Sequence, residues 1–221
     1  MNMALTDLRE SGQVPWGWIV DETRSLEDYR GSASIKDWML EALPAAKLDR
    51  WGGDAPFILT ESRSLAGVLR DLAQEYGVQI AATNGQAAGF LHTEIAPALQ
   101  PGQKILYLGD FDLAGGDIEA NTRRVLVLEQ EVGPLDWERL ALTEAQVIEY
   151  DLQKIIKHHR RFTSCGEHEA VETEALSQRV IVDIVRTRLE ELLPEPLEQV
   201  LERESEQRTR VERVLRSIRR Q

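Results

Sequence analysis

The chain has 221 residues, 42% hydrophobic and 29% charged, a composition typical of a globular protein with one sizeable core. Its net charge of −12 argues against a protein that holds DNA through a basic face alone. No run approaches the ~18 apolar residues that span a bilayer, and the single Cys165 excludes an internal disulfide. We therefore expect a cytoplasmic protein without membrane contact.

Residues 1–54 predict a helical and irregular lead-in. Its clearest element is a helix over 35–43, where apolar residues recur at intervals of three and four before Pro44. The glycine-rich turn 51–56 then introduces a different pattern. We expect a domain boundary here.

Residues 55–151 predict alternating strands and helices. The strands are expected near 57–62, 78–83, 104–109 and 138–142, and the helices near 64–76, 86–99, 116–131 and 144–151. Continuous apolar strands are typical of a parallel sheet buried on both faces. The fold class is therefore α/β, a Rossmann-like domain with a mostly parallel four-stranded sheet covered by helices. Dinucleotide binding is not predicted, because no strand precedes Gly-x-Gly-x-x-Gly.

Residues 152–221 predict a basic loop followed by C-terminal helices. Little periodicity over 152–171 indicates the loop. An amphipathic helix follows from Ser177 to the prolines at 194 and 196, and a last helix begins near Leu197. Its polar middle, 202–210, is expected to face solvent.

Three carboxylates follow predicted strands. Glu61 ends the first, and Asp110 and Asp112 follow the third. Ligands of open α/β sheets bind at the carboxyl ends of strands, so these side chains are expected to converge. Carboxylate oxygens suit Mg²⁺, with Mn²⁺ as an alternative. Glu61, Asp110 and Asp112 are the candidate catalytic and metal-binding residues.

Turn residues near these carboxylates predict a phosphate pocket. Gly115 and Gly116 are expected to allow a tight turn with free N–H groups close to a phosphate. Asn84 and Gly85 end a neighbouring strand and are expected to line the same pocket, although ordinary turn chemistry explains them nearly as well. Asp117 is a further candidate acid, or simply a favourable charge near a helix start.

The spacing of five residues resembles the Toprim domain, in which a glutamate ends one strand and Asp-x-Asp-x-x-Gly-x-x-Ile follows another. The matching residues are Glu61, Asp110, Asp112, Gly115 and Ile118. The chain looks most like Toprim proteins related to the topoisomerase VI A subunit, of the type common in phage and actinobacterial genomes. Segments 12–24, 139–143 with Gln146, and 172–176 have counterparts in that group in the same order.

The resemblance implies Mg²⁺-dependent cleavage or topoisomerase-VI-like processing of DNA. The aspartates would hold the metal, and Glu61 would act as general acid/base or as a further ligand. The winged-helix domain that carries the nucleophilic tyrosine in that family has no counterpart here, so a winged-helix or other protein partner is expected. A homodimer is a further alternative.

Two other functions compete with this interpretation. One is a non-catalytic interaction module, a Toprim-like remnant that docks through its C-terminal helices. The acidic charge and the missing winged helix favour it, whereas the intact carboxylates favour the enzyme. A phosphotransferase or phosphatase on a related fold is a more distant alternative, because Leu113-Ala114 fits its expected motif poorly.

Overall fold

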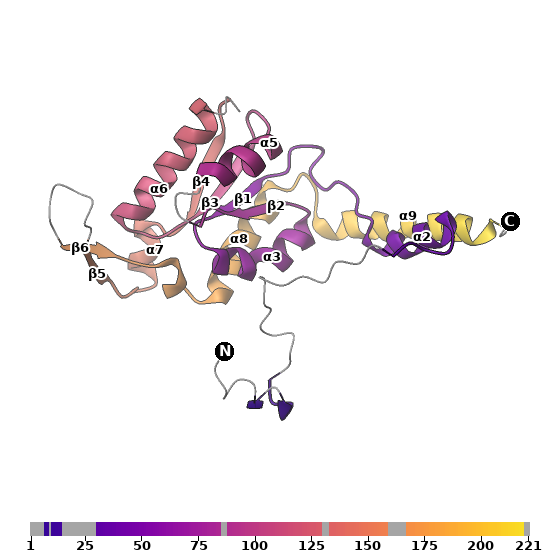
Figure 1. Ribbon diagram of the computed structural model, residues 1–221, viewed down its shortest axis with the longest axis horizontal. Coiled ribbons are helices and arrows are strands. Elements are labelled where there is room, and N and C mark those ends of the chain that lie inside the picture. The colour runs from indigo at the N-terminus through magenta and orange to yellow at the C-terminus, as the bar shows by residue number, and fades with distance from the viewer. Residues whose placement is uncertain are drawn as a thin grey trace.

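The computed structural model describes residues 7, 8, 10–14, 30–84, 88–129, 133–158 and 167–218. A four-stranded parallel sheet lies at the centre of the molecule (Figure 1). Its strands are β1 (Phe57–Thr60), β2 (Gln79–Ala82), β3 (Lys104–Leu108) and β4 (Asp136–Ala141), in the order β2-β1-β3-β4. The predicted α/β fold with a parallel sheet is confirmed.

One face of the sheet packs against α3 (Arg63–Tyr76) and α8 (Gln178–Leu192). The side chain of Ser62 caps the start of α3, and Gly77 ends it in the left-handed conformation, with φ of 66°. Ile58 of β1 and Leu106 of β3 face this side and belong to one core cluster with apolar residues of both helices. The amphipathic pattern of the sequence therefore placed both helices correctly.

The other face of the sheet is covered by the elements that follow β2 and β3. These are α4 (Ala88–Phe90), the π-helical η3 (Leu91–Ile95), α5 (Ala96–Ala98), α6 (Leu113–Arg124) and the π-helical η4 (Val125–Glu129). Phe57 and Leu59 of β1 pack there with Leu91 and Leu126. β1 is thus buried on both faces, which is why the run from Phe57 to Leu59 is continuously apolar. Helix α6 begins at Leu113, three residues earlier than predicted, because Asp112 caps it.

The expectation of a loop over 152–171 is wrong in part. Ile155–His158 (β5) and Glu167–Ala170 (β6) pair as an antiparallel hairpin, with Lys157 opposite His168. Both strands are short, and the neighbouring Ile155 and Ile156 of β5 are both exposed, so burial imposes no apolar alternation on this part of the sequence. The hairpin follows α7 (Glu144–Glu149) and precedes the 3-10 turn η5 (Thr173–Ala175).

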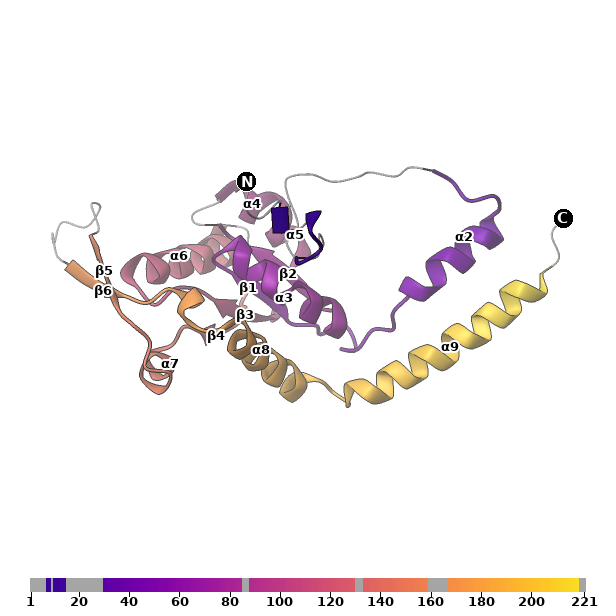
Figure 2. The same cartoon turned by 90° about the horizontal axis from the view of Figure 1, so that it is seen from below.

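An arm of two helices extends from the core (Figure 2). It consists of α9 (Leu197–Ser217) and, lying beside it, α2 (Ile35–Ala42) with the 3-10 turn η2 (Leu43–Ala45). The expectation that the polar middle of α9 faces solvent is wrong for Glu204. That side chain is 5% exposed and lies 3.6 Å from the guanidinium of Arg50, at the base of the arm. No helix in the described ranges is long and apolar enough to cross a membrane.

Candidate functional site

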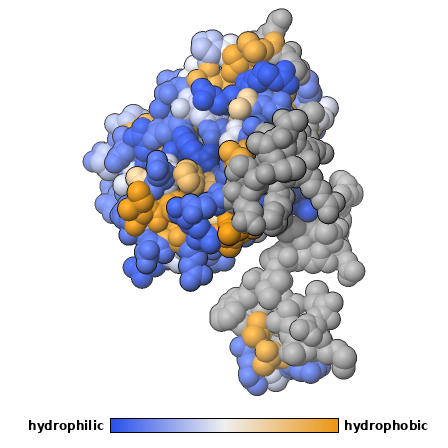
Figure 3. Space-filling model, turned by 90° about the vertical axis from the view of Figure 1, so that its left-hand side faces the viewer, coloured by the Kyte–Doolittle hydropathy of each residue, from blue (hydrophilic) through white to orange (hydrophobic). Residues whose placement is uncertain are grey.

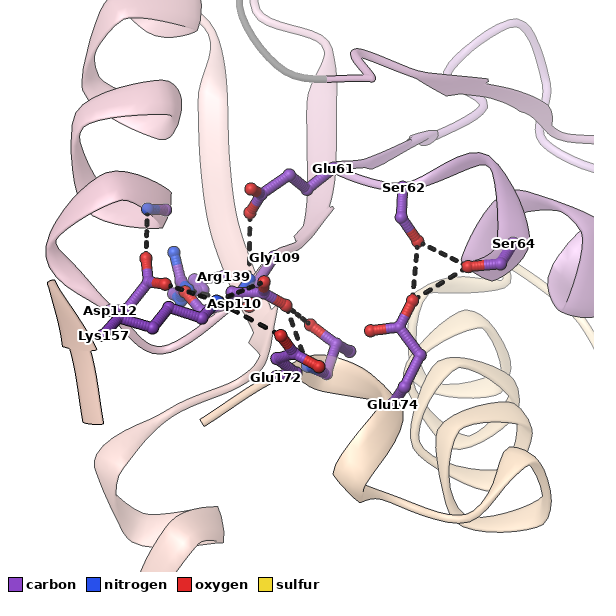
Figure 4. Close-up of polar contacts among 12 residues, drawn as sticks. Glu61, Ser62, Ser64, Gly109, Asp110, Asp112, Arg139, Lys157, Glu172 and Glu174 are labelled. Atoms are coloured by element: carbon purple, nitrogen blue, oxygen red, sulfur yellow. Dashed lines mark hydrogen bonds and ion pairs between the residues drawn. The ribbon is translucent and has the colours of Figure 1, made fainter. Parts of the chain in front are cut away.

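The carboxyl ends of β1 and β3 bring Glu61 next to Asp110. Thr60 and Leu108 are register partners in the parallel pair, so the chain leaves both strands at the same level. Glu61 Oε2 accepts a hydrogen bond from the backbone N–H of Asp110 at 3.0 Å (Figure 4). Asn84 lies at the end of β2, and its backbone N–H donates to the carbonyl oxygen of Glu61 at 2.9 Å. The adjacent Gly85 lies outside the described residues.

Asp110 is fixed by groups from two distant segments. Its Oδ1 accepts hydrogen bonds from the backbone N–H and the hydroxyl of Thr173, at 2.9 and 3.0 Å. Its carbonyl oxygen accepts one from Arg139 Nη2 at 2.6 Å. Thr173 is buried, so this carboxylate is held in one orientation.

Asp112 has two roles, one for each of its carboxylate oxygens. Oδ1 accepts a hydrogen bond from the N–H of Gly115 at 2.6 Å and so caps α6. Oδ2 lies 3.0 Å from Nζ of Lys157. The second oxygen of Asp112 therefore points toward the same cation that Asp110 faces.

Lys157 completes the cluster and was not predicted from the sequence. Its Nζ lies 3.0 Å from Asp112 Oδ2, 3.3 Å from Glu172 Oε1 and 3.8 Å from Asp110 Oδ2. Burial lowers the pKa of Lys157, but the hydrogen bond to Asp112 and the surrounding carboxylates outweigh it, so the pKa is raised above its ordinary value. Lys157 belongs to the basic run of the sequence, but only the hairpin shows where it points.

Two glycines are required by close approach. A Cβ at Gly115 would lie 2.4 Å from the carbonyl oxygen of Asp110. One at Gly109 would lie 2.8 Å from the Tyr107 hydroxyl and 2.9 Å from Glu61 Oε2. Gly116 has open space instead. The expectation of free N–H groups here is wrong, because the N–H of Gly115 donates to the Asp112 side chain and that of Gly116 to its carbonyl oxygen.

Arg139 braces the backbone of the site from β4. Its Nη2 donates to the carbonyl oxygens of Gly109 and Asp110, and its Nε donates to that of Leu142 at 2.8 Å. Its Nη1 pairs with Glu119 of α6. The guanidinium thus ties the loop after β3 to β4 and α6, a role that no local sequence signal revealed beyond its place in segment 139–143.

The electrostatics of the site single out Glu61. Burial raises the pKa of Glu61 above its ordinary value. The charges of Asp110 and Asp112 act in the same direction, while the Asp110 N–H and Arg139 oppose them. Burial and the charge of Glu61 also raise the pKa of Tyr107. The Tyr107 hydroxyl is buried and has no hydrogen-bond partner among the described residues.

A cavity of about 430 Å³ opens beside the aspartates. Its lining combines three carboxylates and a guanidinium with two exposed apolar side chains and a glycine: Asp110, Phe111, Asp112, Leu113, Gly116, Arg139 and Glu169. Figure 3 views the molecule from the end that carries α6, α7 and the hairpin, where hydrophobic patches interrupt a hydrophilic surface. Asp117 is exposed on α6 and is not one of the three carboxylates that pair with Lys157.

The donor set fits one hard cation in part. Within the described ranges, no group of three or more His, Cys, Asp and Glu side chains has an arrangement that could hold a metal ion. Asp110 and Asp112 nevertheless direct one oxygen each toward the same ammonium group. Mg²⁺ often takes only one or two protein carboxylates and keeps water on its other positions. Asp110 and Asp112 therefore supply as many carboxylates as such a Mg²⁺ site uses.

No family model, curated protein or solved structure matches this chain.

Proposed function

We propose that this protein is a Toprim-like, Mg²⁺-dependent enzyme that acts on DNA phosphodiesters. The observation that carries the proposal is the convergence of Asp110 and Asp112 on one positive charge, with Glu61 hydrogen-bonded to the same loop. Asp110 and Asp112 would hold the metal, with Mn²⁺ as an alternative. The ion would supply polarisation of a phosphoryl oxygen and stabilise the charge that develops on it.

The residues around the metal position have separate tasks. Thr173 orients the carboxylate of Asp110, and the N–H of Gly115 orients that of Asp112. The pKa of Glu61 is raised from its ordinary value toward neutral pH, and such a shift suits a group that gives or takes a proton during phosphoryl transfer. Arg139 holds the backbone that connects these groups.

The net charge of −12 limits how this protein would hold DNA. Binding through phosphate neutralisation needs a basic surface. A partner, for example one with a winged helix, would therefore supply most of the DNA contact. The attacking group would be a water molecule or a side chain of that partner, since Tyr107 beside the site is fully buried.

The experiment measures Mg²⁺ and Mn²⁺ binding by calorimetry and cleavage of supercoiled plasmid, for the wild type and three asparagine variants. Asp110→Asn and Asp112→Asn remove the charge but leave an amide oxygen that can still accept the structural hydrogen bonds. Asp117→Asn is the control, because this exposed acid on α6 lies outside the cluster. We expect the first two variants to lose metal binding and any cleavage, and the control to keep both.

Unchanged metal affinity in folded Asp110→Asn and Asp112→Asn would contradict the proposal. Glu61→Gln should keep metal binding if the residue is an acid/base and weaken it if the residue is a ligand. Cleavage by the wild type alone would show that no partner is needed. Metal binding without cleavage would indicate that the site acts only in an assembly.

A second function, an interaction module, is favoured by the helical arm. Trp38 of α2 is 57% exposed and Val214 of α9 is 61% exposed, although both are apolar. A contiguous patch of such side chains would be typical of a protein contact, and the helices that carry these two residues lie beside each other. The double variant Trp38→Ser/Val214→Ser should then lower the mass of the assembly measured in solution, or reduce the capture of a partner protein. Its metal binding should stay unchanged. Unaltered association in the double variant would count against this function.

A further inference from the structure

The oxygens that a divalent cation would need are the ones that face Lys157. Thr173 occupies Oδ1 of Asp110, and the N–H of Gly115 occupies Oδ1 of Asp112. The other oxygen of each carboxylate, Oδ2, is directed at Nζ of Lys157, at 3.8 and 3.0 Å. Figure 4 shows the lysine side chain reaching across Asp112 toward Asp110. The ammonium group therefore faces the two oxygens that would hold a metal.

This contact differs from an ordinary surface ion pair. The side chain of Asp112 is only 6% exposed, and that of Lys157 is 32% exposed. Three carboxylates surround the ammonium group, because Oε1 of Glu172 also lies 3.3 Å from Nζ of Lys157. Lys154 directly precedes β5, and its Nζ pairs with the well-exposed Glu169, which lines the cavity but is not one of the three carboxylates around Lys157. Lys154 thus provides a comparison with a nearby lysine whose ion pair is exposed.

We propose that Lys157 is the internal counter-ion of the carboxylate site and that a divalent cation binds by displacing its ammonium group. The inference rests on the metal site of the proposed function and adds the residue that sets its affinity. Without metal, Lys157 neutralises carboxylates that would otherwise repel each other. With metal, two positive centres compete for the same oxygens, and the ammonium moves away.

Glu172 gives the displaced ammonium a place to go. Its Oε1 already contacts Lys157, and its side chain is 52% exposed, so the Lys157–Glu172 pair can persist at the rim of the site. The long lysine side chain can make this change by rotating its own bonds. Metal binding would then leave Lys157 paired with Glu172, which closely follows β6, rather than with the two aspartates.

The test compares metal affinity in the wild type, Lys157→Met, Lys157→Arg and Lys154→Met. Methionine is close to lysine in length and carries no charge. We expect Lys157→Met to bind Mg²⁺ and Mn²⁺ more tightly by roughly tenfold, within the usual range of coupling between two binding events. Lys157→Arg keeps the competing charge and should stay near the wild type, as should Lys154→Met.

Thermal unfolding supplies a readout that does not depend on activity. In metal-free buffer, Lys157→Met should unfold at a lower temperature than the wild type, because its carboxylates lose their counter-ion. Added Mg²⁺ should raise the unfolding temperature of this variant more than that of the wild type. Lys154→Met should show neither effect.

The failure of this inference can be told apart from the failure of the proposed function. Equal or weaker metal affinity in folded Lys157→Met would overturn the inference and leave the metal site standing. Metal binding by Lys157→Met but not by the wild type would support the inference strongly. An absence of binding in all four proteins would overturn both, since there would be no metal to displace the lysine.

Discussion

Oε2 of Glu61 accepts a hydrogen bond from the backbone N–H of Asp110 at 3.0 Å, which joins the loops after β1 and β3. We predict that Glu61→Ala lowers the free energy of unfolding by about 1–3 kcal/mol, because the partly buried N–H loses its acceptor. Glu61→Gln keeps an amide oxygen there and should cost less. Urea unfolding of both variants measures the difference, and equal losses would contradict a structural role for this bond.

Gly115 and Gly116 are adjacent in α6 but should respond oppositely to alanine. A methyl group at Gly115 would lie 2.4 Å from the carbonyl oxygen of Asp110, so Gly115→Ala must shift the carboxylate loop. We expect a loss of about 1–3 kcal/mol in the free energy of unfolding. At Gly116 the space is open. Gly116→Ala should therefore stabilise the protein by about 0.4–1 kcal/mol, because alanine restricts the unfolded chain.

Denaturation curves of the two glycine variants, measured side by side, check this prediction. Gly116→Ala controls for the general effect of alanine in this helix. A destabilised Gly116→Ala, or an unchanged Gly115→Ala, would mean that the loop after β3 is packed differently from the structure described here.

The sheet and the position of the acidic residues could be predicted because they depend on local patterns. Largely apolar runs marked β1, β2 and β3, and only the apolar end of β4 did so. The helices between the strands are the crossover connections that parallel strands need. A residue directly after such a strand must lie at the carboxyl edge of the sheet. Glu61, Asp110 and Asp112 therefore came together without any knowledge of their contacts.

The partners of these acids could not be predicted, because they come from distant segments. Lys157 is 45 residues from Asp112 in the chain, and Thr173 is 63 residues from Asp110. Neither contact leaves a periodic signal. The predicted exposure of Glu204 was wrong for a related reason. One acidic residue in a polar helix is expected to face solvent unless its distant partner, here Arg50, is known.

Glu204 is predicted to anchor the arm to the core. Its Oε2 accepts a hydrogen bond from the N–H of Leu48 at 2.8 Å and lies 3.6 Å from the buried guanidinium of Arg50. Glu204→Ala leaves that charge buried without its partner, and we expect a loss of about 3–5 kcal/mol in the free energy of unfolding. Glu206→Ala is the control, since its pair with Arg210 is exposed and should contribute under about 1 kcal/mol. Similar losses in both variants would refute the anchoring role.

Glu138 should make the stability depend on acid pH. It lies between Arg188 of α8, at 2.8 Å, and Lys104 of β3, at 3.3 Å. Burial raises the pKa of Glu138, but the hydrogen bonds and charges of Arg188 and Lys104 outweigh it, so its pKa lies below the ordinary 4.5. The unfolded chain therefore takes up this proton first as the pH falls. The contribution of Glu138 is complete above about pH 4.5 and is lost as the pH falls through the lower pKa of the folded state.

Glu138→Gln removes this titration while keeping the shape of the side chain. The variant should unfold more easily than the wild type at neutral pH, and the difference should shrink as the pH falls below about 4.5. The other carboxylates titrate in both proteins, so their effects cancel in the comparison. Unfolding curves of both proteins across this pH range provide the measurement. A difference that stays constant into acid would show that Glu138 contributes through packing rather than through its charge.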